Sequence, residues 1–386
     1  MAPLDGQEKD VQLRGQWYRG GTSKCWLFDA GDVARHAATR SDVLKLLADA
    51  FGASDSRQLD GVGGGTSTTS KAAVITATPD GPADLDYLFA QVGIGQATVE
   101  LGSNCGNCAT AIALYAVQNG IVAAGDVATR VTMRNLNTEA VLSGTVATPR
   151  RRVPTSGQAR VPGSTAPGVP VRLSFHAPWG QTTGALLPTG SASDPLPLAG
   201  GAAPAVTMVD AGAPAVFAPA VDLGVDLRAM TAPLDDRMPE LLELRAAAGL
   251  AMGLRSADDP PQHAIPKVGL VAPPAPYTAA DGSHIAADTH DLRVRMLSMF
   301  APHPAIGLTS AVAVSTAATI PGSLVARSLR PSPNAEGTRR LRIGTPAGVV
   351  TTEVVTDADG AVVEVVLDRA ARQLAVAQIE VARTVA

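Results

Sequence analysis

Two segments of this chain are apolar on almost every side of a helix, which is the strongest constraint that the sequence places on the fold. Residues 109–117 and 308–320 are rich in alanine and branched aliphatic side chains, and neither run contains a charged residue. A surface helix carries a polar stripe, so a helix without one belongs in a core. Asn119-Gly120 and Pro321-Gly322 supply the stop signals. The sequence therefore predicts two buried helices, one in each half of the chain.

Strand-like runs precede and follow each of these helices. In the first half they span residues 13–18, 24–28, 71–77, 85–92, 127–136 and 138–146. In the second half they span residues 206–217, 266–272, 291–300, 337–350 and 351–367. Further helices are expected at residues 41–51 and 238–252. This weak internal repeat suggests duplicated domains whose central helices begin at a shared cleft.

The length of the chain also favours two domains. A chain of 386 residues is too long for one compact core. Residues 188–204 are rich in proline and glycine and are the best candidate for an interdomain connection. We therefore expect an N-terminal domain of residues 1–204 and a C-terminal domain of residues 205–370, with the last segment, about 370–386, available to complete the first. Residues 147–169 form a second Pro- and Gly-rich stretch, which we interpret as a surface excursion.

Composition excludes several classes of protein. Hydrophobic residues make up 46% of the chain and charged residues 17%, as in a folded protein with large buried surfaces. The net charge of −4 gives no reason to expect a nucleic-acid partner. No signal-peptide pattern and no apolar run of membrane-spanning length is visible. Three cysteines make no disulfide framework, so we expect a reduced, cytoplasmic protein. The small number of charged residues and the abundant alanine are compatible with a homodimer.

A cysteine stands at the entrance to the first predicted buried helix. Cys105 lies in the run 103–108, Ser-Asn-Cys-Gly-Asn-Cys, directly before the apolar segment. A helix start presents free N–H groups and the positive end of the helix dipole. We therefore expect the thiolate form of Cys105 to be favoured, and an anion to bind beside it.

A glycine-rich polar loop leads to a lysine at the start of a predicted strand. Residues 60–71 read Asp-Gly-Val-Gly-Gly-Gly-Thr-Ser-Thr-Thr-Ser-Lys, and Lys71 opens the strand. The loop lacks the Gly-Lys-Ser/Thr ending of a phosphate loop and the last glycine of a dinucleotide fingerprint. To act as a base, Lys71 must be uncharged, which burial or a cation such as Arg19 would favour. A thiol and a lysine on such loops indicate acid–base chemistry on an anionic substrate.

Other motifs leave alternatives open. Cys105 and Cys108 form a Cys-x-x-Cys pair, which a redox protein would use, although one pair cannot close a zinc site. The six histidines show no metal-ligand spacing, so no metal site is expected. His303 precedes the second buried helix and is either a ligand contact or a packing residue. Arg19 lies in a Gly-rich turn where it could bind a carboxylate in bidentate fashion or remain a surface residue.

Taken together and in order, these motifs resemble one family. Residues 19–24 (Arg-Gly-Gly-Thr-Ser-Lys), 63–71 and 104–107 (Asn-Cys-Gly-Asn) are similar to three signatures of the methylaconitate isomerase (PrpF-type) family. Residues 266–268 and 303–322 are similar to its second-half signatures. The resemblance covers nearly the whole chain and implies a fold like that of diaminopimelate epimerase. That fold is α+β, with two pseudo-symmetric domains, each a mostly antiparallel sheet wrapped round a central helix.

The resemblance also implies an activity and a set of site residues. Members of this family isomerise unsaturated di- and tricarboxylates such as aconitate, methylaconitate or oxalomesaconate without a cofactor, by a 1,3-allylic shift or a cis–trans change. By resemblance, Lys71 and Cys105 are the catalytic acid–base pair. Small anionic substrates are expected to contact Arg19, Gly21, Thr22, Ser23, Ser67, Thr68, Asn104, Gly106, Asn107, Lys267, His303, Thr309 and Ser310.

The chain departs from the family pattern at three places and leaves two rivals in other classes. Cys25, Cys108 and Ala213 replace the usual family residues, and the last of these changes lies where a ligand could touch. A racemase or epimerase on the same fold would need a second thiol, but residues 307–310, Gly-Leu-Thr-Ser, fill that segment. A non-catalytic carboxylate-binding protein is the other alternative, which a proton-exchange assay distinguishes.

Overall fold

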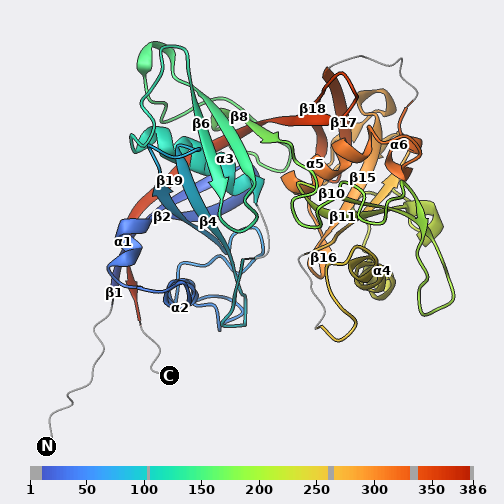
Figure 1. The fold of residues 1–386 in the computed structure, drawn as a ribbon, viewed down its shortest axis with the longest axis horizontal. Coiled ribbons are helices and arrows are strands. Elements are labelled where there is room, and N and C mark those ends of the chain that lie inside the picture. The colour runs from blue at the N-terminus through green and yellow to red at the C-terminus, as the bar shows by residue number, and fades with distance from the viewer. Residues whose placement is uncertain (1–10, 102–104, 260–264, 331–337, 383–386) are drawn as a thin grey trace, which may run out of the picture.

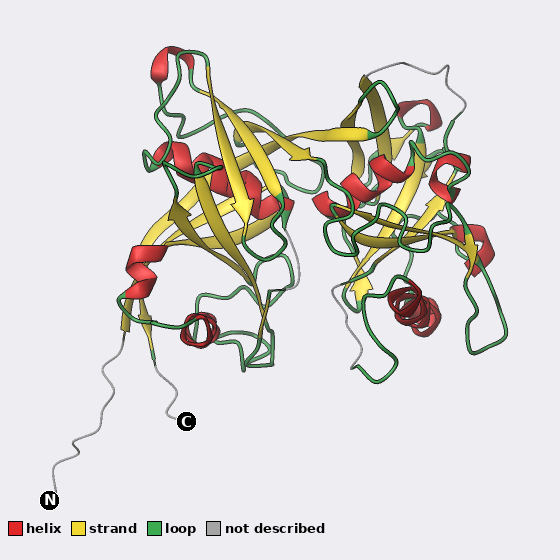
Figure 2. Cartoon of the chain, viewed as in Figure 1, coloured by secondary structure: helices red, strands yellow, loops and turns green. Residues whose placement is uncertain are grey.

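The computed structural model describes residues 11–101, 105–259, 265–330 and 338–382. Figure 1 shows two lobes side by side, one built mainly from the first part of the chain and the other mainly from the second, with strand β19 running between them. Strands predominate over helices in both lobes (Figure 2). Across the described residues, hydrogen bonds link seventeen strands into one sheet system, parallel at four places and antiparallel elsewhere. The α+β class expected from the sequence is confirmed.

The first lobe is a closed barrel around one helix. Strand pairing runs in a ring from β1 through β2, β3, β4, β6, β7, β8 and β19 back to β1. Helix α3 (Gly106–Gln118) lies inside the ring and is buried along nearly its whole length. The strands are β1 (Val11–Gly20), β2 (Ser23–Asp29), β3 (Lys71–Ala77), β4 (Leu85–Val92), β6 (Ala128–Asn135), β7 (Val141–Ala147), β8 (Val169–His176) and β19 (Val362–Val381), with the short β5 (Val99–Glu100) beside β4.

Two helices and a short turn cover the outside of the first lobe. Helix α2 (Arg40–Phe51) begins at Thr39, whose side chain forms a capping box with Asp42, and ends at the left-handed Gly52. Its apolar residues pack against the outer face of the barrel. The other elements are α1 (Ala30–Ala34) and the 3₁₀ turn η1 (Pro149–Arg151).

The second lobe is built in a similar way around α5 (Leu308–Ala317). Pairing runs from β10 through β11, β12, β15, β17 and β18 to the first part of β19. Every residue of α5 is buried, and helix α4 (Met238–Ala251) packs on the outer face. The strands are β10 (Ala205–Ala211), β11 (Ala213–Pro219), β12 (Lys267–Ala272), β15 (Leu292–Ser298), β17 (Thr338–Thr345) and β18 (Gly348–Thr356). Smaller elements are β9 (Asp194–Pro195), η2 (Ala220–Leu223), η3 (Asp235–Arg237), β13 (Tyr277–Thr278), β14 (His284–Ile285), η4 (Ala287–Thr289), β16 (Ala301–Pro302) and α6 (Leu324–Arg327).

Strand β19 joins the lobes because it pairs with strands of both. Its first residues pair with β18 in the second lobe, its middle pairs with β8, and its last part pairs with β1 over residues 371–381. The expected strand at residues 351–367 is therefore two strands, β18 and the start of β19. Residues 188–204 lie along the second lobe, where β9 pairs with β10 and Leu196 donates a backbone hydrogen bond to Pro204.

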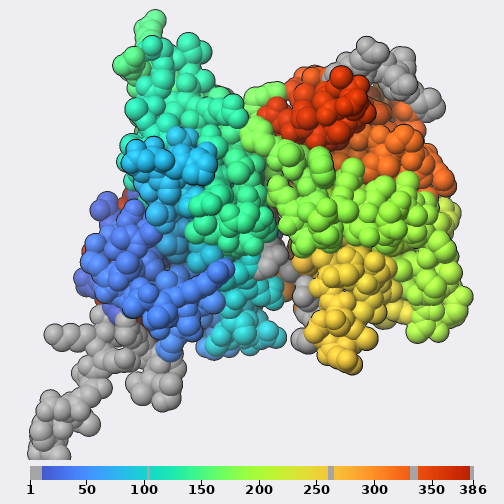
Figure 3. Space-filling view, in the orientation of Figure 1, coloured from blue at the N-terminus to red at the C-terminus, as the bar shows by residue number. Residues whose placement is uncertain are grey.

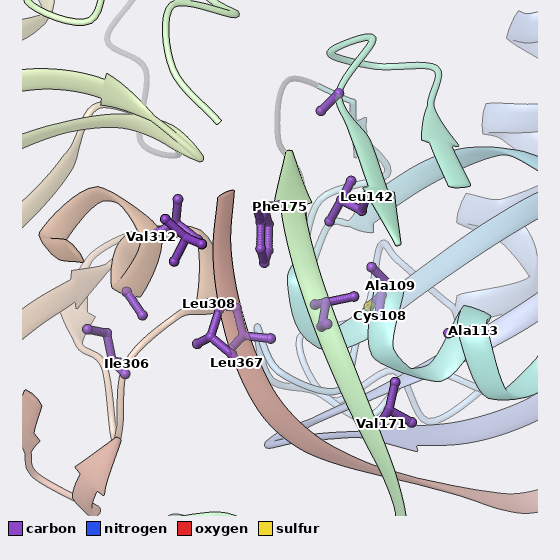
Figure 4. Packing of buried hydrophobic residues seen from close by; sticks show 14 of the residues in the cluster. Cys108, Ala109, Ala113, Leu142, Val171, Phe175, Ile306, Leu308, Val312 and Leu367 are labelled. Carbon is purple, nitrogen blue, oxygen red and sulfur yellow. The ribbon is translucent and has the colours of Figure 1, made fainter. Parts of the chain in front are cut away.

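The two buried helices begin next to each other, and this contact fixes the geometry between the lobes. A Cβ atom placed on Gly106 would lie 2.6 Å from Cβ of Leu308 and 2.9 Å from the ring of Phe175. Figure 4 shows Leu308 and Phe175 packed with Leu367 between the two helices. Only a residue without a side chain allows this approach at the start of α3.

Candidate active site

A pocket lies between the lobes where α3 and α5 begin, with an empty volume of about 760 Å³ that includes open solvent. Figure 3 shows that the surface is hollowed between the lobes below their junction. The first lobe lines the pocket with Ser23, Ser67, Thr68, Lys71, Phe89, Gln91, Glu100, Cys105, Gly106 and Asn107. The second lobe lines it with Lys267, Leu297, Ser298, Met299, His303, Gly307, Leu308, Thr309 and Ser310.

Lys71 is delivered to the pocket by the start of β3. Its Nζ atom donates a hydrogen bond to Oε1 of Gln91, its register partner on β4. The amine also lies 5.3 Å from the centre of the Phe89 ring, within the range of a cation–π contact. Gln91 is itself fixed by a hydrogen bond from its Nε2 atom to the carbonyl of Ser70 at 2.9 Å. The lysine is therefore held in place by a neutral acceptor and an aromatic ring.

Cys105 is the residue that precedes the first turn of α3, and its thiol contacts Cys108 one turn on. The hydrogen bond between the two thiols and burial raise the pKa of Cys105 well above its ordinary value, although Lys71 acts in the opposite direction. The expectation that the helix start favours the thiolate is therefore wrong, because the thiol neighbour and burial outweigh the helix end. Cys105 carries its proton at neutral pH, which suits a proton donor. All three cysteines are free thiols.

Asn107 connects the pocket to a buried cation. Its Nδ2 atom donates hydrogen bonds to Oγ1 of Thr22 at 3.1 Å and to Oγ of Ser23 at 3.3 Å. Its Oδ1 atom accepts a hydrogen bond from Arg369 on β19 at 3.2 Å. The left-handed Gly21 (φ 52°) leaves room for this contact, since a Cβ atom there would lie 2.1 Å from Oδ1 of Asn107. Both ends of the Asn107 amide are therefore oriented.

The second lobe contributes Lys267 and His303 to the pocket, and the pKa of each side chain is lowered. Burial, helped by Lys71 and Arg245, lowers the pKa of Lys267 to about 8. Burial and the two lysines lower the pKa of His303 to about 4. The Nδ1 atom of His303 accepts a hydrogen bond from the backbone N–H of Ala305 at 2.9 Å, so the neutral ring carries its proton on Nε2.

The structure brings most of the predicted site residues together. Lys71 and Cys105, the expected acid–base pair, line the same pocket. So do Ser23, Ser67, Thr68, Gly106, Asn107, Lys267, His303, Thr309 and Ser310. Gly21 and Thr22 lie one layer behind, where they contact Asn107. Asn104 lies outside the described residues.

Arg19 is placed differently from the expectation. Its guanidinium donates hydrogen bonds to the carbonyl of Gly21, to Oγ of Ser164 at 3.1 Å and to the carbonyl of Pro167 at 3.0 Å. The contacts with Ser164 and Pro167 hold the side chain against residues 147–169, and Arg19 does not line the described pocket. Arg19, which was expected to bind a substrate carboxylate, is therefore hydrogen-bonded to the Pro- and Gly-rich residues 147–169 instead. The separation of 145 residues between Arg19 and Ser164 explains why local sequence did not reveal it.

Several lining residues were missed because nothing in their own segments marks them. Gln91 and Phe89 lie within an ordinary strand, β4, whereas Ser298 is the last residue of β15 and Met299 comes directly after it. The pairing of β4 with β3 and of β15 with β12 brings these segments to the pocket. Gln91 could have been found from strand register, since it is directly opposite Lys71.

The site has a strong bias toward anions. Glu100 is the acidic residue among the described lining residues, whereas Lys71 and Lys267 are basic. The N-terminal ends of α3 and α5 both open at the pocket, so the dipoles of both helices favour negative charge there. Among the described residues, no group of three His, Cys, Asp or Glu side chains could hold a metal ion. In the same residues, no helix is both long and apolar enough to cross a membrane.

Comparison with known proteins agrees with this geometry. The sequence model of the PrpF protein family matches residues 11–382. The chain is 36% identical over 368 residues to (4E)-oxalomesaconate Delta-isomerase of Novosphingobium sp., covering 93% of this chain and 94% of the relative. It is 32% identical over 387 residues to 2-methyl-aconitate isomerase of Shewanella oneidensis, covering 94% and 95%.

Solved structures extend the comparison to the fold. A methylitaconate-delta-isomerase superposes with a TM-score of 0.78 at 30% identity, covering 97% of each chain. A hydroxyproline epimerase from Agrobacterium vitis superposes with a TM-score of 0.53 at 12% identity, covering 96% and 93%, which is a likeness in fold alone. The resemblance expected from the motifs is confirmed, and this chain belongs to the PrpF family.

Proposed function

We propose that this protein is a cofactor-independent isomerase that moves a proton and a double bond in an unsaturated di- or tricarboxylate such as aconitate, methylaconitate or oxalomesaconate. Its relatives carry the names of isomerases of oxalomesaconate, 2-methylaconitate and 3-methylitaconate. The observation that carries the proposal is the meeting of Lys71 and Cys105 at one pocket with an anion-favouring lining.

Recognition of the carboxylates is supported by the charges and donors of the pocket. Two carboxylate groups can be met by the lysines and by the free N–H groups at the starts of α3 and α5. The hydroxyls of Ser67, Thr68, Thr309 and Ser310 add hydrogen-bond donors without bulk. Glu100 opposes anion binding by charge, and it is exposed to solvent, which screens its effect.

The chemistry follows from the groups present. Removal of a proton allylic to a conjugated carboxylate pushes an electron pair through the double bond onto the carboxylate oxygens. Helix N-termini and lysines stabilise this developing charge in a partly water-excluded site. A proton returned to the other end of the allyl system completes the shift. Lys71 and Cys105 are the proton-exchanging groups in this proposal, and Cys105 begins with its proton in place.

A two-thiol racemase is the weaker alternative. Such an enzyme would need a thiol at the start of α5 to match Cys105 at the start of α3, and Gly307 stands there. The redox alternative would need Cys108 to act as a resolving thiol, although burial raises the pKa of Cys108 well above its ordinary value. Neither alternative accounts for Lys71 and Lys267 in the same pocket.

We also propose that the two lobes are the two pseudo-symmetric domains expected from the sequence. The pairing of β9 with β10 supports a boundary before residue 194, and the pairing of β19 with β1 supports completion of the first domain by the C-terminal strand.

The proposed function is tested by incubating the protein with trans-aconitate, methylaconitate, methylitaconate and oxalomesaconate in D₂O and recording proton NMR spectra. We expect isomerisation of at least one acid with incorporation of solvent deuterium at carbon. Ligand-induced thermal stabilisation without isomerisation or exchange for any acid would identify a binding protein instead.

A further inference from the structure

A buried arginine lies behind the first turn of α3. Arg369 belongs to the middle of β19, opposite Val171 of β8, where the strand enters the first lobe (Figure 1). Only 5% of its surface is exposed. No carboxylate of the described residues forms an ion pair with it, and the charged neighbour that acts on it is another cation, Arg19. A buried charge without a counter-charge is costly to fold, so its contacts point to a role other than stability.

The guanidinium of Arg369 can donate hydrogen bonds but cannot accept them. A terminal N–H group donates to Oδ1 of Asn107 at 3.2 Å, whereas the Nε–H group finds no acceptor among the described residues. The opposite orientation of the Asn107 amide would set its NH₂ group against the guanidinium. Buried donors on both sides would then lack an acceptor, which is costly. The arginine therefore fixes which end of the amide faces away from it.

The oriented amide gives both of its hydrogens to hydroxyls of the β1–β2 turn. Nδ2 of Asn107 donates to Oγ1 of Thr22 at 3.1 Å and to Oγ of Ser23 at 3.3 Å. Each hydroxyl thus receives a hydrogen bond at its oxygen and keeps its own hydrogen atom. In the described part of the chain, the hydroxyl hydrogen of Ser23 has no acceptor. Ser23 lines the pocket, so this hydrogen is available to a ligand there.

The backbone holds the same groups in one geometry. Gly21, in the turn between β1 and β2, donates its backbone N–H to the carbonyl of Ala370, the neighbour of Arg369, at 2.8 Å. Gly21 has a left-handed φ of 52°. A Cβ atom on it would lie 2.1 Å from Oδ1 of Asn107 and 2.6 Å from Nη2 of Arg369. Because only glycine leaves this space, the turn, the start of α3 and β19 are fitted together around the contact between arginine and asparagine.

A chain of donors therefore leads from the buried cation to the pocket. Arg369 donates to Asn107, Asn107 donates to Ser23, and Ser23 has a hydrogen left for a ligand. Hydrogen bonds arranged head to tail strengthen one another, because a group polarised by the bond that it accepts becomes a better donor. A carboxylate that accepts the last hydrogen also lies in the field of a positive charge that is buried away from solvent. The chain therefore favours an anion at its end.

We propose that Arg369 is a positioning residue for substrate binding, which acts through Asn107 to present the Ser23 hydroxyl as a hydrogen-bond donor to a substrate carboxylate. The inference rests on the proposed isomerase function, because that function supplies the carboxylate. No proton changes owner in this role, and the proton transfers stay with Lys71 and Cys105. Loss of Arg369 should therefore weaken substrate binding and leave the chemical step nearly unchanged.

The test is a double-mutant cycle between Arg369 and Ser23 in the full-length protein. It measures kcat and KM for the acid that the wild type isomerises fastest, and the Kd of trans-aconitate by calorimetry. We expect Ser23→Ala to raise KM and Kd about tenfold in the wild type, the scale of one hydrogen bond to a charged group, with kcat within about threefold. In Arg369→Met the same serine substitution should change them by less than about twofold, because the donor is no longer presented. Arg369→Lys, which also has donors only, should keep the effect of Ser23→Ala. Arg372→Met, exposed on the same strand, is the matched control and should behave as the wild type.

A second variant keeps the test decisive if Arg369→Met does not fold. Asn107→Asp gives the arginine an ion pair and draws the hydroxyl hydrogen of Ser23 to its own carboxylate. Its thermal stability should equal or exceed that of the wild type, and Ser23→Ala should again have little effect on KM. An undiminished effect of Ser23→Ala in both backgrounds, or a loss in kcat alone in Arg369→Met, would make Arg369 a structural residue and overturn the inference. Failure of the wild type to isomerise any acid would instead refute the proposed function, and the inference with it.

Discussion

Gly106 and Leu308, the first residues of the two buried helices, lie so close that a Cβ atom on Gly106 would be 2.6 Å from Cβ of Leu308. The contact brings two helix N-termini to one pocket and sets the separation between the lobes. It also explains why the pocket residues arrive from segments about 200 positions apart, because each lobe contributes the start of its own central helix.

Replacing Gly106 by alanine should therefore push the helix starts apart. We expect kcat/KM to fall by more than about tenfold, because small displacements of positioned groups are costly in catalysis. Overpacking should also lower the unfolding free energy by about 1–3 kcal/mol. Enzyme kinetics and urea unfolding measure the two effects. Gly200→Ala, where the added Cβ meets nothing within 4 Å, is the control; equal behaviour of the two variants would show that the helix contact is unimportant.

The two cysteines of the Cys-x-x-Cys pair should differ sharply in effect. Cys105 lines the pocket and Cys108 is wholly buried behind it. We expect Cys105→Ser to lower kcat by about a hundredfold and Cys108→Ser to keep most of the activity. Steady-state kinetics of the two variants under reducing conditions give the comparison. Similar large losses in both would favour a dithiol mechanism over the isomerase mechanism.

His303 should make the protein sensitive to acid. Its pKa is about 4 in the folded protein, against an ordinary value of 6.5, so the unfolded chain binds the extra proton between these values. Stability attributable to His303 is complete above pH 6.5 and falls by about 3 kcal/mol as the pH drops toward 4. Urea unfolding from pH 7 to 4.5 should show a shallower loss in His303→Gln than in the wild type. The exposed His284→Gln serves as control, and parallel curves for all three proteins would contradict the prediction.

Arg19 should matter for the surface excursion and little for substrate affinity. We expect Arg19→Met to speed trypsin cleavage within residues 147–169, because the two guanidinium hydrogen bonds that fix this segment, to Ser164 and Pro167, are lost. KM should change by less than about threefold, since the residue does not line the pocket. Limited proteolysis and steady-state kinetics check the two parts. Arg14→Met, exposed on the same strand, is the matched control; a large rise in KM with unchanged cleavage would restore Arg19 to the substrate site.

Local pattern was sufficient for much of the fold. The two apolar helices follow from composition and spacing, since no polar stripe is available to face water. The strand that begins at Lys71 and the helix that begins after Cys105 follow from the loops that precede them. The pairing of β19 with β1 did not follow, because it joins residues more than 350 positions apart through backbone hydrogen bonds that any sequence can make.

The same distinction applies to the site. Lys71 and Cys105 were predictable because unusual small-residue loops deliver both. The direction of the Cys105 pKa was not, because it depends on the packing of Cys108 and on burial. The role of Arg19 depends on Ser164 and Pro167, which fold back onto it from a distant segment. Sequence thus predicted residues that line the pocket, whereas their protonation and their hydrogen-bond partners depend on three-dimensional contacts.

The most direct test of the account is the rate of solvent deuterium incorporation into a substrate acid, measured by NMR for the wild type and for Lys71→Met. Ligand-induced thermal stabilisation confirms that the variant still folds and binds. We predict exchange at carbon that keeps pace with isomerisation in the wild type and is slowed by about a hundredfold or more in Lys71→Met. Equal exchange rates in the two proteins would contradict the proposal that this lysine handles the migrating proton.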